Sequence, residues 1–343
     1  MSNHLHEPAV HQTTNRMRAI VRDTYGDADV LRLASIARPD AADLGEREVL
    51  LRVHAAGLDR GTWHIMAGLP YLGRLAFGLR RPRNPVLGLD VAGTVVAVGA
   101  AATRFAAGDE VFGFGKGTFA EYAVAREDRL ALKPANLTFE QAAVVPVSAG
   151  TALQALTDHG RLEAGQTVLV VGASGGVGSY AVQLAKALGA GEVTGVASTA
   201  KLDLVRSLGA DRVLDYTSDD WADGSRAYDL VLDIGGNPSL SRLRRALTPR
   251  GTAVIVGGER GGNFSGGMNR PLRGLAWSPF LRQRLTNFVA RQRAGDLDRL
   301  AGFLEAGTLR PSIDGSYPLG EVPQAMRHLV AGKVSGKVAI TVS

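Results

Sequence analysis

Residues 167–186 read TVLVVGASGGVGSYAVQLAK and combine an apolar run, a glycine-rich turn and a segment with helical spacing of apolar residues. The run predicts a buried strand and the last segment predicts a helix. The glycines between them allow a sharp turn and a close approach of a phosphate to the backbone. The N-terminus of the helix adds free N–H groups and a partial positive charge. This order of elements predicts a site for the pyrophosphate of a dinucleotide.

A purely structural tight turn would show a similar glycine pattern, so the flanking sequence has to decide between the two interpretations. The next apolar run, Val193 to Ala197, follows at the spacing of a second parallel strand. We therefore expect the turn to bind a nicotinamide dinucleotide. The residues expected to contact it are Gly172, Ser174, Gly175, Gly176, Val177 and Gly178, together with Gly257 and Lys337.

The end of the second predicted strand indicates which dinucleotide is bound. An NAD enzyme places a carboxylate about 20 residues after the last glycine, against the ribose hydroxyls. Here the sequence is Ser198-Thr199-Ala200-Lys201, and two hydroxyls with an ammonium suit a 2′-phosphate. Tyr216 is expected to flank the adenosine. The alternative is that Ser198 only caps the next helix and Lys201 lies in solvent. We predict NADP(H) as the cofactor.

The chain of 343 residues shows four successive patterns, which together predict an α/β protein of two domains. Residues 1–16 are polar and aperiodic and predict a disordered leader. Residues 17–141 carry short alternating runs typical of an antiparallel β-barrel. Residues 142–291 alternate strands with helices, as in a doubly wound parallel sheet. Residues 292–343 resemble the first domain in pattern and are expected to return to it.

The composition excludes several classes of protein. No run of about 18 apolar residues is present, and the N-terminus lacks the layout of an export signal, so we expect a cytoplasmic protein without membrane contact. The chain has no cysteine, which removes disulfides and thiolate metal sites. The formal charge of +6 is carried by scattered arginines, which argues against nucleic-acid binding. We expect a small-molecule substrate and a homodimer.

The glycine turn also carries a family resemblance. The positions Gly165, Gln166, Leu169, Ala173, Ser174, Gly175, Gly176, Gly178, Gln183 and Lys186 fit the signature of the quinone oxidoreductase and zeta-crystallin branch of the medium-chain dehydrogenases/reductases. The resemblance extends from Met17 to the end of the chain. It implies a GroES-like catalytic domain split around a Rossmann domain, with NADPH and the substrate in the cleft between them.

The same resemblance bears on metal chemistry. Zinc alcohol dehydrogenases of this superfamily take ligands from cysteines and from a Gly-His-Glu sequence. In this chain Leu89 and Asp90 stand in the place of the His-Glu pair. One carboxylate does not hold a catalytic zinc, which needs about three protein ligands. We therefore predict a metal-free reductase that transfers a hydride from NADPH to a quinone or an α,β-unsaturated carbonyl.

The catalytic side chains are harder to assign. The segment Leu58 to His64 is similar to the Asn-Pro-x-Asp-Trp stretch of the family, but it departs from that pattern at Asp59 and Thr62. Asp59, Thr62, His64 and Tyr71 are candidates to bind the substrate oxygen or relay a proton. Each of the four is also consistent with a structural or solvent-facing role.

Two other functions stay open at this point. A binding protein of the same fold would hold NADPH without useful turnover, because a fold does not fix a function. An NAD(P)-dependent alcohol dehydrogenase would need the metal site that the sequence does not supply. Consumption of NADPH with quinones and enones separates a reductase from a binding protein.

Overall fold

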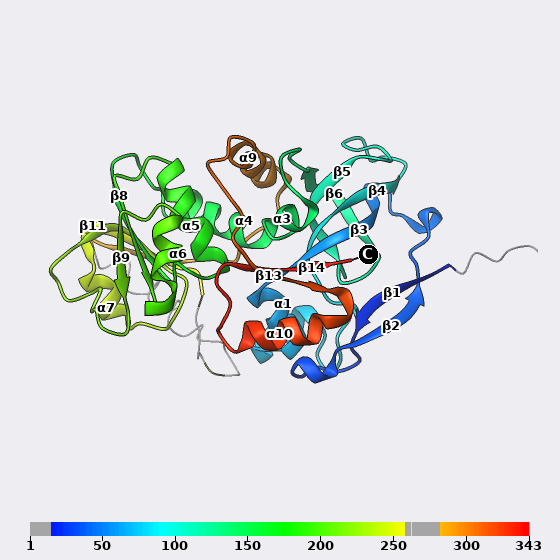
Figure 1. The fold of residues 1–343 in the computed structure, drawn as a ribbon, viewed down its shortest axis with the longest axis horizontal. Coiled ribbons are helices and arrows are strands. Elements are labelled where there is room, and N and C mark those ends of the chain that lie inside the picture. Colours follow the sequence, from blue (N-terminus) through cyan, green and yellow to red (C-terminus); the bar gives the residue numbers. More distant parts are fainter. Residues whose placement is uncertain (1–14, 258–261, 263–281, 343) are drawn as a thin grey trace, which may run out of the picture.

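The computed structural model describes residues 15–257, 262 and 282–342, and Figure 1 shows that they form two lobes. Residues 1–14 of the expected leader lie outside the described residues. Its last residue, Arg16, already belongs to a strand. One lobe contains a parallel sheet, and the other contains a mainly antiparallel sheet. Both sheets appear in the order that the sequence predicts.

The parallel sheet has six strands in the order β12-β11-β10-β7-β8-β9. Helices pack on both faces of this sheet. The evidence is that the side chains on its two faces belong to two different apolar clusters. The doubly wound sheet is therefore confirmed. Its elements are β7 (Thr167–Val171), α5 (Gly176–Ala187), β8 (Glu192–Ala197), α6 (Leu202–Ser207), β9 (Arg212–Asp215), β10 (Tyr228–Asp233), α7 (Leu240–Arg245), β11 (Leu247–Ile255) and β12 (Arg284–Asn287).

The second sheet has the order β13-β14-β3-β4-β5-β6, and β3 also pairs with β6. This extra pairing closes β3 to β6 into a barrel, which removes the free edges of these four strands, while β13 remains at an edge of the sheet. Its elements are β3 (Glu48–Leu58), α1 (Arg60–Ala67), α2 (Arg74–Phe77), β4 (Asp90–Val98), β5 (Glu110–Lys116), β6 (Tyr122–Leu132), β13 (Ile313–Pro318), α10 (Val322–Val330) and β14 (Lys337–Thr341); β1 (Arg16–Val21) and β2 (Arg32–Ala37) form a separate ribbon.

The C-terminal segment returns to the barrel, since β14 pairs with β3 in antiparallel register. Its first residue, Lys337, therefore lies beside the end of β3 and close to the parallel sheet. The backbone N–H of Gly336 donates to the carbonyl of Ser174 in the glycine turn, at 2.8 Å. The domain limits at residues 141 and 291 stay a prediction.

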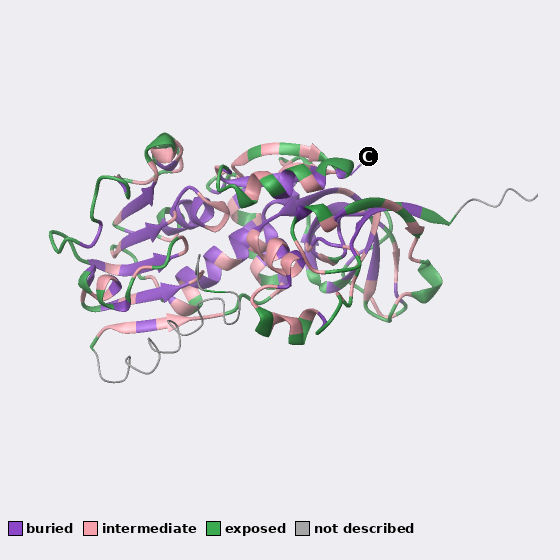
Figure 2. Cartoon of the chain, turned by 90° about the horizontal axis from the view of Figure 1, so that it is seen from below, coloured by how far each residue is buried: buried purple, intermediate pink, exposed green. Residues whose placement is uncertain are grey.

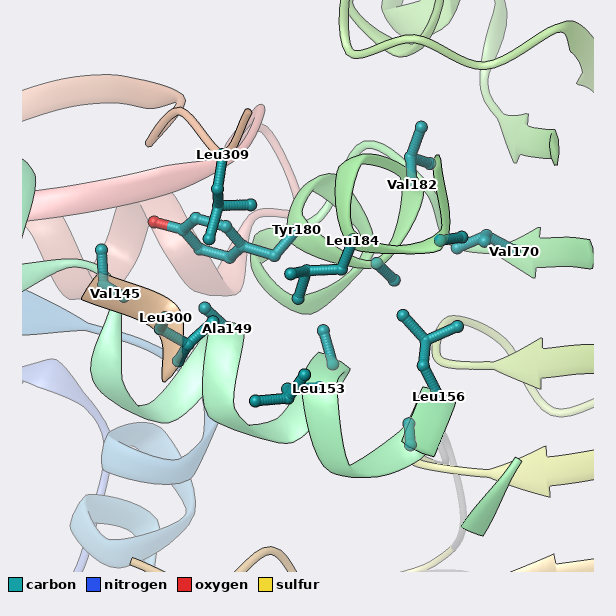
Figure 3. Packing of buried hydrophobic residues seen from close by; sticks show 14 of the residues in the cluster. Val145, Ala149, Leu153, Leu156, Val170, Tyr180, Val182, Leu184, Leu300 and Leu309 are labelled. Carbon is teal, nitrogen blue, oxygen red and sulfur yellow. The ribbon is translucent and has the colours of Figure 1, made fainter. Parts of the chain in front are cut away.

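The core that joins the lobes is built from helices α3 (Phe139–Ala143), α4 (Pro146–Gln154) and α9 (Ala294–Glu305) against the parallel sheet. Figure 3 shows Ala149 and Leu153 of α4 facing Tyr180 and Leu184 of α5. The Tyr180 hydroxyl donates to the carbonyl of Val144 at 3.1 Å, so its polar atom is satisfied in the core. Burying one such large apolar side chain stabilises the fold by about 1.5–3 kcal/mol.

Burial follows this arrangement, with the strands of both sheets mostly buried and the peripheral helices half exposed (Figure 2). No helix in the described ranges is long and apolar enough to cross a membrane.

Candidate active site

The glycine turn connects β7 to α5 in the way that the sequence predicts. Gly172 has a φ of +88°, which favours glycine. A Cβ atom on Gly178 would lie 2.1 Å from the carbonyl oxygen of Gly172, so only glycine permits the close packing of helix on turn. A Cβ on Gly175 would meet nothing closer than that same oxygen at 3.5 Å. The backbone at Gly175 therefore faces open space, as a phosphate site requires.

This space is part of a cavity of about 1220 Å³ between the two lobes. It lies at the carboxyl ends of the parallel strands, where open α/β sheets bind their ligands. Its volume exceeds the usual range of about 300–1,000 Å³ for small-molecule sites, so it has room for a dinucleotide beside a substrate. The residues lining it include all of Gly172, Ser174, Gly175, Gly176, Val177, Ser198, Lys201, Tyr216, Gly257 and Lys337. Gly178 contacts the turn and does not line the cavity.

One end of the cavity lies beyond β8 and β9. Ser198, Lys201 and Tyr216, which the sequence predicts to bind the 2′-phosphate and the adenosine, line it. The Lys201 ammonium donates to the carbonyls of Gly332 (3.0 Å) and Val334 (2.6 Å). It therefore also ties the chain before β14 to the parallel-sheet lobe.

Thr199 has a different position from the one predicted. It does not line the cavity, and its hydroxyl donates to the carboxylate of Asp215 at the end of β9. Hydrogen bonds from Thr199 and Thr217 lower the pKa of Asp215, which stays ionised. This carboxylate is held by its neighbours and does not line the cavity, so it is not presented to a ribose.

The opposite end of the cavity has a buried polar floor. Lys337 is 1% exposed, and its Nζ donates to Ser148 Oγ at 3.0 Å. The same ammonium lies 3.6 Å from Asp90 Oδ2 and 4.0 Å from Asp59 Oδ2. A Cβ on Gly176 would lie 3.1 Å from Lys337 Cδ and 3.2 Å from Ser148 Oγ. This polar cluster therefore lies next to the glycine turn; its members are Asp59, Asp90, Ser148 and Lys337.

The two carboxyl groups of this floor, Asp59 and Asp90, have different surroundings. Asp90 is fully buried, and its Oδ1 accepts the N–H of Val147 at 2.9 Å. Burial raises the pKa of Asp90 well above its usual value, and Lys337 opposes the shift. Asp59 has its second oxygen on the N-terminus of α1, where it accepts the N–H of Thr62 at 2.8 Å. Two carboxyl groups thus share one ammonium in a site of low solvent access.

The predicted catalytic residues fall into two groups. Asp59 and His64 line the cavity, and Thr62 and Tyr71 do not. Thr62 is fully buried, and its hydroxyl is 3.3 Å from Asp59 Oδ1, so it belongs to the helix cap. Tyr71 is 45% exposed and contacts the guanidinium of Arg74 instead. The structure therefore does not bring Thr62 or Tyr71 to the cavity.

His64 is a poor proton donor as placed. Burial lowers the pKa of its imidazole, which is therefore mostly neutral at pH 7. Its Nδ1 lies 2.8 Å from the carbonyl of Leu69, and only a protonated nitrogen makes that hydrogen bond. The nitrogen left over, Nε2, accepts a proton rather than supplying one.

Comparisons with known proteins agree with this geometry. Residues 45–135 match the family described as the alcohol dehydrogenase GroES-like domain, and residues 208–340 match the zinc-binding dehydrogenase family. The 2-methylene-furan-3-one reductase of Solanum lycopersicum is 34% identical over 95% of this chain and 79% of its own length. The chloroplastic NADPH-dependent alkenal/one oxidoreductase of Arabidopsis thaliana is 34% identical over 94% and 79%. The solved quinone oxidoreductase of Coxiella burnetii superposes with a TM-score of 0.83 at 27% identity, over 96% of this chain and 100% of that one.

The chain belongs to the quinone oxidoreductase branch of the medium-chain dehydrogenases/reductases. The GroES-like and Rossmann domains implied by the sequence resemblance are thereby confirmed. In the positions where zinc members of this superfamily carry ligands, the chain has Leu89 and Asp90, and it has no cysteine at all. Within residues 15–257, 262 and 282–342, no group of three or more His, Asp or Glu side chains is arranged to hold a metal ion.

Several residues that line the cavity were not identified from the sequence. Ser148 follows no motif, and only its place on the first turn of α4 brings it to Lys337. Trp221 and Arg242 also line the cavity, with the guanidinium 4.7 Å from the indole ring and bound to Asp220 at 2.8 Å. The basic run at residues 242–245 stands out in the sequence, but nothing in the sequence indicates that it lies near the ends of β8 and β9.

Proposed function

We propose that the chain is an NADPH-dependent, zinc-independent reductase that transfers a hydride to a quinone or to the double bond of an α,β-unsaturated carbonyl. The observation that carries the proposal is one continuous cavity that joins the open face of Gly175 to the buried floor around Lys337. The names of its relatives, an alkenal/one oxidoreductase and a quinone oxidoreductase, support the same chemistry. The cofactor supplies the hydride when it is bound.

The chain's own residues have three tasks. The backbone at Gly175 and Gly176, at the N-terminus of α5, binds the pyrophosphate. Ser198, Lys201 and Tyr216 bind the 2′-phosphate and the adenosine. At the other end the Ser148 hydroxyl, which accepts a hydrogen bond from Lys337, donates a hydrogen bond to the substrate oxygen, and the proton that completes the reduction comes from water. Lys337 then stabilises the negative charge that develops there.

The proposal includes partners and location. We propose that the substrate is a small molecule, that no nucleic acid or membrane takes part, and that the protein acts as a homodimer in the cytoplasm. The scattered distribution of arginine supports the absence of nucleic acid. Sedimentation equilibrium tests the dimer directly.

Lys201→Ala is expected to weaken NADPH binding about 10- to 150-fold, because a charge-assisted hydrogen bond contributes about 1.5–3 kcal/mol. NADH binding should hardly change. Titration of both cofactors against wild type and variant checks this, with Lys186→Ala as the control because that lysine pairs with Asp211 outside the cavity. Since Lys201 also holds Gly332 and Val334, a thermal melt must accompany the titration. Equal losses for NADPH and NADH would show that Lys201 does not bind the 2′-phosphate.

Removal of metal is expected to leave the activity unchanged. A catalytic zinc polarises the substrate oxygen, so a true zinc enzyme stops after chelation. Here prolonged dialysis against a strong chelator should preserve NADPH-dependent reduction of quinones or enones. Alcohols should be poor substrates with or without added zinc. Loss of activity on chelation and its recovery with zinc would overturn the zinc-independent assignment.

A further inference from the structure

A second cavity, of about 380 Å³, lies in the barrel lobe and shares no lining residue with the cavity at the glycine turn. It is lined by the apolar side chains Ile65, Phe77, Val86, Leu87, Leu89 and Phe114 and by the charged side chains Arg22, Glu48, Arg83, Lys116, Arg126 and Arg129. Cationic side chains outnumber the one acidic side chain in this lining, even though Arg126 is already paired with Asp128 at 2.9 Å. Such a cavity favours an anion with an apolar body.

Arg22 is the unusual member of this lining. It is 1% exposed and the largest fully buried side chain in the described part of the protein. Burial lowers the pKa of its guanidinium to about 10, so the group is still charged at pH 7. It forms no ion pair with any described carboxylate, and the contact that faces its charge is the ring of Tyr25 at 5.3 Å. A buried charge without a partner costs several kcal/mol, on the order of that for other desolvated ions.

The guanidinium has one edge in use and one edge free. Its Nη1 donates to the carbonyl of Met66 at 3.1 Å. Its Nε is buried and has no hydrogen-bond partner among residues 15–257, 262 and 282–342. The edge formed by Nε and Nη2 presents two parallel N–H groups, which match the two oxygens of a carboxylate. A purely structural role as an anchor for Met66 would need only Nη1.

We propose that this cavity binds an organic carboxylate with an apolar body, held at the Nε edge of Arg22. The carboxylate neutralises the buried guanidinium, and the apolar body packs against Ile65 and Phe77. Lys116 and Arg83 add to the positive field at the cavity wall. The site is separate from the cavity assigned to the dinucleotide, since the two share no lining residue.

The test uses the full chain at pH 7 and constant ionic strength, with octanoate and benzoate as probes. Octanol and benzyl alcohol are the neutral controls, and inorganic phosphate is the third arm. Calorimetric titration and thermal unfolding should show saturable binding of the carboxylates at one site and a higher Tm, and no effect of the alcohols. The wild type should take up NADPH equally well with and without octanoate.

Arg22→Met is expected to weaken carboxylate binding at least about tenfold, which corresponds to one charge-assisted hydrogen bond. In the absence of carboxylate this variant should melt no lower than wild type, since it removes an uncompensated buried charge. Arg32→Met is the matched control, because Arg32 is exposed, pairs with Asp23 and does not line the cavity. If Arg22→Met does not fold, Arg22→Lys, which keeps the charge and loses the fork, should show the same weakening.

Three results would overturn the proposal. The first is no carboxylate response in the wild type, and the second is equal affinity in wild type and in the Arg22 variant. The third is a response to phosphate that equals the response to octanoate, which would assign the site to a free inorganic anion.

Discussion

Gly175→Val is expected to abolish dinucleotide binding in a protein that still folds. Gly175 has φ −84° and ψ 178°, an extended conformation that valine adopts readily. Its Cβ would meet only the Gly172 oxygen at 3.5 Å, so the protein itself has room for a side chain. The added methyl groups would then occupy the space through which a pyrophosphate approaches the backbone. Titration with NADPH and a thermal melt of the same sample check the expectation.

The same substitution three residues later is the matched comparison. At Gly178 the Cβ would lie 2.1 Å from a backbone oxygen that has no freedom to move away. Gly178→Val is therefore expected to lower the free energy of unfolding by about 3 kcal/mol or more, as for severe overpacking. Unchanged NADPH affinity in folded Gly175→Val would place the phosphate site elsewhere in the cavity.

Lys337→Met is expected to destabilise the fold by about 3–5 kcal/mol near neutral pH, because removal of one partner leaves buried charge uncompensated. Asp90 and Asp59 are the groups left behind, at 3.6 and 4.0 Å from the lost ammonium. Lys333→Met is the control, since Lys333 is exposed on the same segment and should change stability by less than about 0.5 kcal/mol.

The deficit of Lys337→Met should depend on pH. The pKa of Asp90 is raised by burial, so its protonated form stabilises the fold fully below the ordinary carboxyl pKa. That contribution is lost as the pH rises through the raised value. Without Lys337 the pKa of Asp90 rises further, so the deficit should be larger at pH 8 than at pH 5.

Urea unfolding at pH 5 and pH 8 measures this difference. The double variant Lys337→Met with Asp90→Asn should recover part of the lost stability at pH 8, because the amide carries no charge. A deficit that is the same at both pH values and unaffected by Asp90→Asn would show that Lys337 acts only through packing.

The fold could be predicted from the sequence because the patterns that indicate its strands and helices are continuous along the chain. The run before Gly172 and the helical spacing after Gly178 are continuous in the chain, and β7 begins and ends where the pattern predicts. β12 went unrecognised because only Leu285 of its four residues is buried, too few to show a period. β3 extends to Leu58, past the small residues at 55–57 that interrupt its apolar run.

The floor of the cavity could be predicted only in part: Asp59 and Lys337 were named as site residues, but their meeting with Asp90 and Ser148 was not, because the four come from distant parts of the chain. Asp59, Asp90, Ser148 and Lys337 meet only after β14 has paired with β3 and α4 has packed on α5. Thr62, in contrast, was named as a candidate site residue, but it does not line the cavity. An aspartate three residues before a threonine at a helix start is a capping pattern, and its hydroxyl turned out to serve the cap.

The most direct test of the central claim is the oxidation of NADPH by a panel of quinones and enones, followed by absorbance with product analysis. We expect turnover by the wild type with at least one member of the panel, formation of the quinol or saturated carbonyl in equal amount to the NADPH consumed, and no turnover by Gly175→Val. Tight binding of NADPH without oxidation by any acceptor would contradict the reductase and leave a dinucleotide-binding protein.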